Sequence, residues 1–194
     1  SPALADFNGD GAAEISIAST SSRTIHLIKA DGFELEGWPV GPYQEATMAS
    51  TPVIGDIDGD GKFDVGLASP ASLFLAVLNN DYTAVGGVRA WTARGQVIDL
   101  NGGGRFPAIM FESSLGDWSK AAAPTLADID NDGKLDIVGS SIMDRTYLPV
   151  SLKAARKFRS SIYVWGLETP FDAETLPWPA FRQNARQTGF LLPS

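Results

Sequence analysis

The sequence predicts an all-β fold of three repeated units, because one acidic loop between two short strands occurs three times. In the clearest copy, residues 128–136, acidic residues stand at alternate or near-alternate positions around an Asn-Asp-Gly reversal. Residues 56–64 repeat this stretch almost letter for letter, and residues 6–14 repeat it with Asn8 and Glu14 as oxygen donors. Runs of small, apolar and β-branched residues flank each loop, as is typical of strands. The loops are therefore expected to connect paired strands.

The first unit is expected at about residues 1–50. Strands are predicted at 15–18 and 24–29, after the acidic loop. The Ala-Asp-Gly sequence at 30–32 is a hairpin signal, so residues 33–36 are interpreted as a fourth, outer strand. This order gives a four-stranded antiparallel unit.

The second unit, at about residues 51–122, repeats the order with strands at 65–68 and 87–91. Two stretches, 69–85 and 101–121, read as insertions into it. Long loops on a rigid scaffold often carry function.

The third unit, at about residues 123–177, has predicted strands at 137–140 and 161–165, with an insertion at 141–160 between them. Residues 178–194 read as a closing segment. The whole chain, 1–194, is thus interpreted as one region of repeats.

Carboxylates in this arrangement indicate a site for a hard cation, since Ca²⁺ takes about 6–8 oxygen ligands. An EF-hand places a bidentate Glu at its twelfth loop position, whereas each copy here has an acid at the ninth. Side-chain oxygens at the first, third, fifth and ninth positions and a carbonyl at the seventh are the expected donors. The three predicted Ca²⁺ sites comprise Asp6, Asn8, Asp10, Ala12 and Glu14; Asp56, Asp58, Asp60, Lys62 and Asp64; and Asp128, Asp130, Asp132, Lys134 and Asp136.

The pattern Asp-x-Asp/Asn-x-Asp-Gly-x-x-Asp/Glu between two short strands resembles the FG-GAP (VCBS) repeats of secreted bacterial proteins and of the β-propellers of integrin α subunits. The resemblance implies that each loop binds Ca²⁺ and joins the first two strands of a propeller blade. About three four-stranded antiparallel blades are therefore expected. Closed propellers have about 4–8 blades, so further blades, from upstream sequence, another chain or a second copy, are expected to complete the ring. The open faces of the incomplete ring are expected to carry apolar residues, among them Val53, Ile54, Leu126, Trp91 and Trp165.

The composition narrows the function classes. The formal net charge of −8 mostly reflects the acidic loops and disfavours nucleic-acid binding, which requires clustered positive charge. The chain has no cysteine for a disulfide or a thiolate metal site, and no apolar run approaches the ~20 residues of a membrane span. Loops of the weaker, extracellular kind need abundant Ca²⁺, so a secreted or cell-surface location is expected, with the natural N-terminus upstream of Ser1.

Other residues offer weaker signals. His26, the one histidine, is interpreted as an ordinary strand residue rather than a catalytic group. Trp91 and Trp165 recur at one position of their units, which favours packing between blades. Ligand candidates in the insertions are Phe106, Phe111 and Trp118, and a basic run of Lys153, Arg156, Lys157 and Arg159.

Three functions remain open at this point. The first is a binding or adhesion module with a carbohydrate or protein ligand. The second is a fragment of an enzyme that resembles Ca²⁺-dependent polysaccharide lyases built on propellers, which is less favoured because no catalytic constellation is evident. The third is a structural segment of a larger surface protein.

Overall fold

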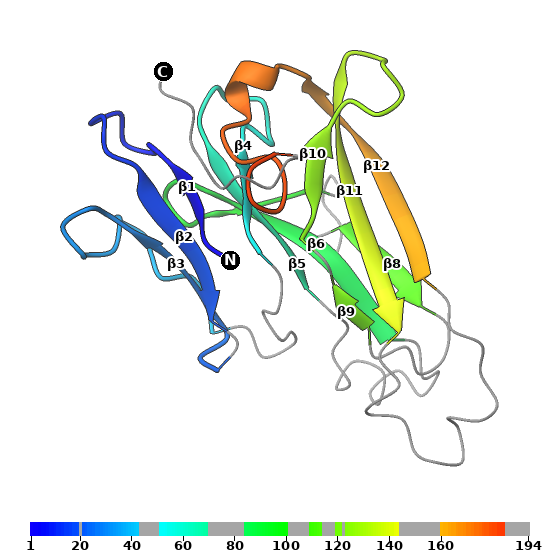
Figure 1. Cartoon of the computed structure of the whole chain (residues 1–194), viewed down its shortest axis with the longest axis horizontal. Helices are drawn as coiled ribbons and strands as arrows, with labels where there is room; N and C mark the ends of the chain where they lie inside the picture. The colour runs from blue at the N-terminus through cyan, green and yellow to red at the C-terminus, as the bar shows by residue number, and fades with distance from the viewer. Residues whose placement is uncertain are drawn as a thin grey trace.

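The computed structural model describes residues 1–19, 21–42, 51–69, 84–100, 109–113, 119–121, 123–143 and 160–184. These residues form three antiparallel sheets and one short 3₁₀ helix, η2 (Ala173–Thr175), so the all-β prediction is confirmed (Figure 1). No helix in this part of the chain has the length and apolar character needed to cross a membrane.

The first sheet has the order β1 (Ala3–Ala5), β2 (Glu14–Ser19), β3 (Thr24–Ile28). The prediction of a fourth strand at 33–36 is wrong: only Glu34 forms an isolated bridge, to Ile28. The chain turns inward at Gly37 so that the indole of Trp38 is buried and donates, at 2.8 Å, to the carbonyl of Ala93 in the turn that follows Thr92. This tertiary contact outweighs the local strand preference.

The second sheet contains β4 (Val53–Gly55), β5 (Asp64–Ser69), β6 (Ala84–Thr92), β7 (Val97–Ile98) and β8 (Ile109–Ser113). Both β7 and β8 pair with the edge of β6 that faces away from β5. The five strands therefore occupy four positions, and β8 comes from the stretch expected to be an insertion.

The third sheet contains β9 (Ser119–Ala121), β10 (Thr125–Ala127), β11 (Lys134–Met143) and β12 (Ser160–Pro170). Strands β9 and β10 share one edge of β11, and β12 occupies the other. This sheet has three strand positions rather than the predicted four. The sheets are compatible with consecutive propeller blades, since β4 contacts both β1 and β10 and the three acidic hairpin loops lie at one end of the molecule (Figure 1).

Apolar clusters join neighbouring sheets. The cluster between the first two sheets contains Ile25, Leu27, Trp38, Val40, Val65, Leu67 and Trp91. The cluster between the second and third contains Val53, Ile57, Ala68, Ala90, Ile98, Leu126, Leu135, Ile137 and Leu176, with Trp165 partly buried against it. Trp91 pairs with Val65 and Trp165 with Ile137, at the same position of each sheet, so the prediction that both tryptophans pack between blades is confirmed.

The start of the closing segment, at Trp178 and Pro179, lies along the innermost strands. Trp178 is buried and forms a bridge with Ile54 of β4, and the carbonyl of Pro179 accepts a hydrogen bond of 2.8 Å from Leu126 N in β10. The segment thus ties the second sheet to the third at their inner edges.

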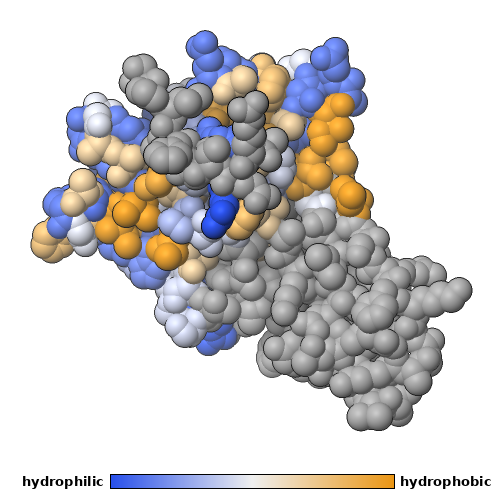
Figure 2. Space-filling model, in the orientation of Figure 1, coloured by the Kyte–Doolittle hydropathy of each residue, from blue (hydrophilic) through white to orange (hydrophobic). Residues whose placement is uncertain are grey.

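The two end sheets present different apolar residues from those expected. Val53, Ile54, Leu126 and Trp91 are buried, so their predicted place on open faces is wrong. Instead, Ile15 and Ile17 of β2 are exposed, as are Ile162 and Val164 of β12. Figure 2 shows hydrophobic residues over the first sheet and along the edge where Figure 1 places β12.

The pairing of residues between strands explains why these isoleucine and valine side chains are exposed. Ile15 holds the position that Val65 and Ile137 hold in the other sheets, where both are buried against the preceding sheet. Val164 likewise holds the position of Leu27, which is buried against the following sheet. The end faces therefore repeat the chemistry of the internal junctions without a neighbouring sheet.

Several candidate residues fall outside the described part. They are the predicted ligand candidates Phe106 and Trp118 and the basic run at 153–159. Most residues of the predicted insertions at 69–85 and 141–160 also lie outside it. Phe111 lies in β8.

Replacing Trp91 by alanine should remove one of the two tryptophan side chains of the cluster between the first two sheets. We expect the free energy of unfolding to fall by about 3–5 kcal/mol, the usual cost of truncating a buried tryptophan. Urea unfolding followed by far-UV circular dichroism measures it. Phe33→Ala, at a side chain that is 71% exposed, is the control, and equal stability of the two variants would contradict the packing described above.

Candidate metal centres

The three acidic loops make the same sharp turn through residues with left-handed backbone at their fourth and sixth positions. Glycine holds both positions in the first two loops, with φ of 75° and 85° at Gly9 and Gly11 and 83° and 82° at Gly59 and Gly61. In the third loop Asn131, with φ of 62°, stands before Gly133. Asparagine tolerates this conformation better than most residues, so the turn is preserved.

The first acid of each loop is fixed by backbone donors. One of its carboxylate oxygens accepts from the N–H of the sixth-position glycine across the turn. The pairs are Asp6 with Gly11 at 2.8 Å, Asp56 with Gly61 at 2.9 Å, and Asp128 with Gly133 at 3.0 Å. These bonds orient the carboxylate toward the inside of the loop.

The ninth acid is buried and connects the two strands of the hairpin. Glu14, Asp64 and Asp136 are only 1%, 1% and 4% exposed. Each accepts from the N–H of the second loop residue: Phe7 at 2.7 Å, Ile57 at 2.8 Å and Ile129 at 2.8 Å. Glu14 also accepts from the Asn8 amide at 3.0 Å, and Asp64 from Asp58 N at 3.4 Å. A buried carboxylate is costly unless it is hydrogen-bonded or paired with a cation, and one or two such bonds leave part of its acceptor capacity available.

Two groups of acids come close enough to hold one metal ion. Asp56, Asp58 and Asp60 have carboxylate oxygens within 4.8 Å of one another, and so do Asp128, Asp130 and Asp136. Asp64 and Asp132 belong to the same two loops, where Asp132 Oδ1 accepts from Lys134 N at 2.8 Å. The second and third loops thus each assemble a carboxylate cluster of the kind predicted.

The first loop is arranged differently. The Asn8 amide nitrogen donates to Asp10 Oδ2 and to Glu14 Oε1, both at 3.0 Å. The amide therefore joins two acids through its donor group. To bind a cation, it must turn so that its oxygen faces the acids.

The seventh residues were predicted to contribute carbonyl oxygens. Their N–H groups donate to the fifth-position acid, at 2.7 Å for Ala12 and 2.9 Å for Lys62. The ammonium of Lys62 also pairs with Asp60 at 2.9 Å, and that of Lys134 pairs with Glu168 at 2.7 Å. Their role as carbonyl ligands stays a prediction.

Burial and mutual repulsion raise the pKa of several of these acids. Desolvation, with the carboxylates of Asp58 and Asp60 nearby, raises the pKa of Asp64 to about 7. Desolvation, then repulsion from Asp10 and Asp6, raises the pKa of Glu14. A divalent cation among the acids would reverse both shifts, because an opposite charge favours the ionised form.

Contacts from the first and second loops to the next sheet were not predicted from the sequence. The ring of Phe7 packs edge-to-face against Phe63 of the second loop, with centroids 6.2 Å apart. The hydroxyl of Thr169 in β12 donates to the carbonyl of Ile57 at 2.7 Å. The loops therefore belong to the junctions between sheets. Thr169 lies 112 residues from Ile57 in the sequence. Its contact with the second loop can therefore be recognised only from the packing of the third sheet against the second.

His26 lies on β3 as predicted for a strand residue. Its Nδ1 is 2.7 Å from Glu34 and its Nε2 is 2.9 Å from the Thr24 hydroxyl.

A comparison with protein-family models matches residues 6–67 to the FG-GAP-like repeat. This segment contains the first two acidic loops and the strands that follow them. Neither the comparison with curated proteins nor that with solved structures found a match. The third loop lies outside the matched residues but repeats the hydrogen bonds of the first acid and the ninth. The chain therefore carries an FG-GAP-like repeat at residues 6–67, as its acidic loops predicted.

Proposed function

We propose that this chain is a Ca²⁺-binding part of a larger β-propeller in a secreted or cell-surface protein, and that it serves as a binding or structural module rather than as an enzyme. The observation that carries the proposal is the carboxylate cluster in the second and third loops. One cluster lies in the hairpin between β4 and β5, and the other in the hairpin between β10 and β11.

Ca²⁺ is the cation that these donors favour. The clusters offer only oxygen ligands, and hard cations with flexible, high coordination numbers prefer carboxylate and carbonyl oxygen. The sequence has no cysteine to supply a thiolate ligand, and its one histidine is engaged with Glu34 and Thr24. Three ions per chain are proposed, one in each loop.

The ion's role is structural in this proposal. A loop whose acids repel one another would splay without a cation, and the Phe7–Phe63 and Ile57–Thr169 contacts at its rim would weaken with it. Metal binding to the native state alone therefore stabilises the junctions between sheets by mass action.

The exposed apolar end faces support the proposal that this chain is only part of a ring of blades. A three-sheet segment with exposed isoleucines at both ends matches the description of consecutive blades whose neighbours are missing. The proposed partners are the remaining blades of the same protein, in another chain, or a second copy of this chain.

A fragment of a Ca²⁺-dependent polysaccharide lyase is the alternative. Incubation with pectin-like polymers and measurement of unsaturated-product absorbance separates it from the proposed module. Product formation that requires Ca²⁺ would replace our proposal by the enzyme.

Calorimetric titration of the full chain should find three Ca²⁺ per chain, with the first site weakest because Asn8 contributes no charge. Asp64→Asn and Asp136→Asn should each remove one ion and lower the melting temperature only when Ca²⁺ is present. Asp31→Asn, at a carboxylate outside the loops that pairs with Lys29, is the matched control. Unchanged stoichiometry in both loop variants would refute the assigned sites.

Ca²⁺ binding to the second loop should weaken as the pH falls through about 7. In the metal-free fold the pKa of Asp64 is raised from 3.8 to about 7. The unfolded chain therefore loses this proton at a lower pH than the fold does, and the stability of the metal-free fold decreases as the pH rises from about 3.8 to about 7. The ion binds the ionised form, and its apparent affinity should drop about tenfold per pH unit below 7 and level off above it. Titrations across this range test the expectation, and a flat profile would count against it.

The end faces should drive self-association of the isolated chain. Ile162→Asp places a charge on a side chain that is 76% exposed on β12, so we expect a lower mass in sedimentation at high concentration. Phe33→Asp, at an exposed residue in the bend after β3, is the control. A wild-type chain that stays monomeric at every concentration would contradict unsatisfied end faces.

A further inference from the structure

A cleft of about 510 Å³ lies between the first and second sheets, at the end of the molecule that carries the acidic loops. One wall comes from the first loop and the bend after β3, and the other from the second loop and the β6–β7 turn. The lining residues are Phe7, Asn8, Leu35, Glu36, Asp60, Lys62, Asp64, Thr92, Ala93, Arg94 and Gln96. Its volume falls in the ~300–1,000 Å³ range of small-molecule sites.

The two walls of the cleft are in direct contact with each other. The Trp38 indole donates to the carbonyl of Ala93 at 2.8 Å. Gly37 lies so close to the opposite turn that a Cβ there would clash with the Arg94 carbonyl oxygen, and a Cβ on Gly95 would clash with the Gly37 oxygen. The cleft is therefore formed by a rigid junction and needs no loop closure to exist.

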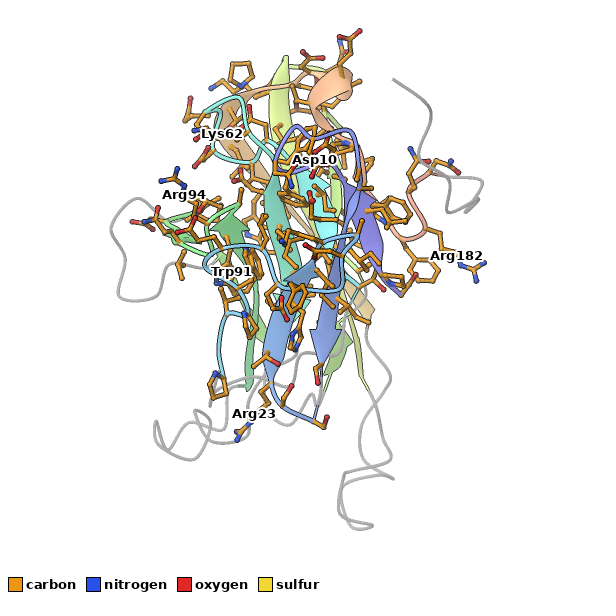
Figure 3. The ribbon with its side chains drawn as sticks, turned by 90° about the vertical axis from the view of Figure 1, so that its left-hand side faces the viewer. Asp10, Arg23, Lys62, Trp91, Arg94 and Arg182 are labelled. Atoms are coloured by element: carbon orange, nitrogen blue, oxygen red, sulfur yellow. The ribbon has the colours of Figure 1, made fainter. Side chains whose placement is uncertain are left out.

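Polar side chains of both kinds face this space. Within the described part of the chain, the side chains of Glu36, Arg94 and Gln96 have no hydrogen-bond partner. Together they offer a carboxylate acceptor, a guanidinium donor and an amide that does both. Figure 3 shows Arg94 and Lys62 near each other at this edge of the molecule.

The rim carries charges of both signs, from Glu36, Asp60 and Asp64 and from Lys62 and Arg94. Arg94 and Glu36 lie on opposite walls, and Lys62 pairs with Asp60 at 2.9 Å. An anionic ligand would meet the carboxylate of Glu36 on one wall, and a cationic ligand would meet the guanidinium of Arg94 on the other, whereas hydroxyl groups can donate to the carboxylate and accept from the cation. The side chains of Phe7 and Leu35, both partly buried, add apolar surface to one wall.

We propose that this cleft binds a neutral saccharide, about one or two sugar rings in size. Ring hydroxyls bond to Glu36, Arg94 and Gln96, and the apolar face of a ring lies against Phe7 and Leu35. This inference goes beyond the metal-binding module, because it assigns a ligand site that requires no bound ion.

The test adds maltose, cellobiose and lactose separately to the full 194-residue chain and follows ¹H–¹⁵N NMR shifts. At least one of these disaccharides should shift the amide signals of Leu35, Ala93 and Gln96. Arg94→Gln and Gln96→Ala should each weaken that binding by about tenfold or more, the effect of losing one hydrogen bond to a charged or well-placed polar group. Near-UV circular dichroism identifies a variant that fails to fold, and the other variant then decides.

Arg23→Asn is the matched control, since Arg23 is an exposed arginine at the far end of the first sheet (Figure 3), and asparagine accepts its φ of 58°. Its affinity should equal that of the wild type. Three results overturn the proposal: no shift with any of the three sugars at millimolar concentration, binding that both cleft variants retain, or shifts produced by digalacturonate while the neutral sugars give none.

Discussion

The hydrogen bond from the second loop residue to the buried ninth-position carboxylate is the constraint on which the rest of the structure depends. It fixes where the second strand starts relative to the first, and the register that follows is the same in all three sheets: Ala5 faces Glu14, Gly55 faces Asp64, and Ala127 faces Asp136. Because side chains alternate along a strand, this register also decides which face of each sheet every later residue occupies. One carboxylate thus sets the pattern of the apolar junctions.

The local parts of the fold followed from the sequence. The acidic hairpins and the cores of the strands at Glu14–Ser19, Asp64–Ser69 and Thr24–Ile28 depend on turn residues and on neighbours within a few positions. A prediction that failed concerns a segment whose conformation depends on contacts with residues far away in the sequence. Residues 33–36 do not complete a strand, because Trp38 is buried against Ala93.

The site shows the same division between local and distant information. Spacing alone placed the acids of the second and third loops in one turn, and two of the three loops bring three carboxylates together. Spacing did not indicate that the Asn8 amide donates to Asp10 and Glu14, since an asparagine offers a donor as well as an acceptor. Nor did it identify Thr169 or the cleft at Arg94, which exist only once two sheets pack together.

The junctions between sheets give the chain a direction. Each junction joins one kind of face to another: Leu27 and Ile25 of the first sheet meet Val65 and Trp91 of the second. The contact is therefore heterologous, and a further sheet can be added at either end by the same rule. Such an array has no internal stop. Whether it ends as a closed ring or continues as a filament is set by the rotation between successive sheets, so a small change in the tilt at one junction alters the assembly and not only the stability of the chain.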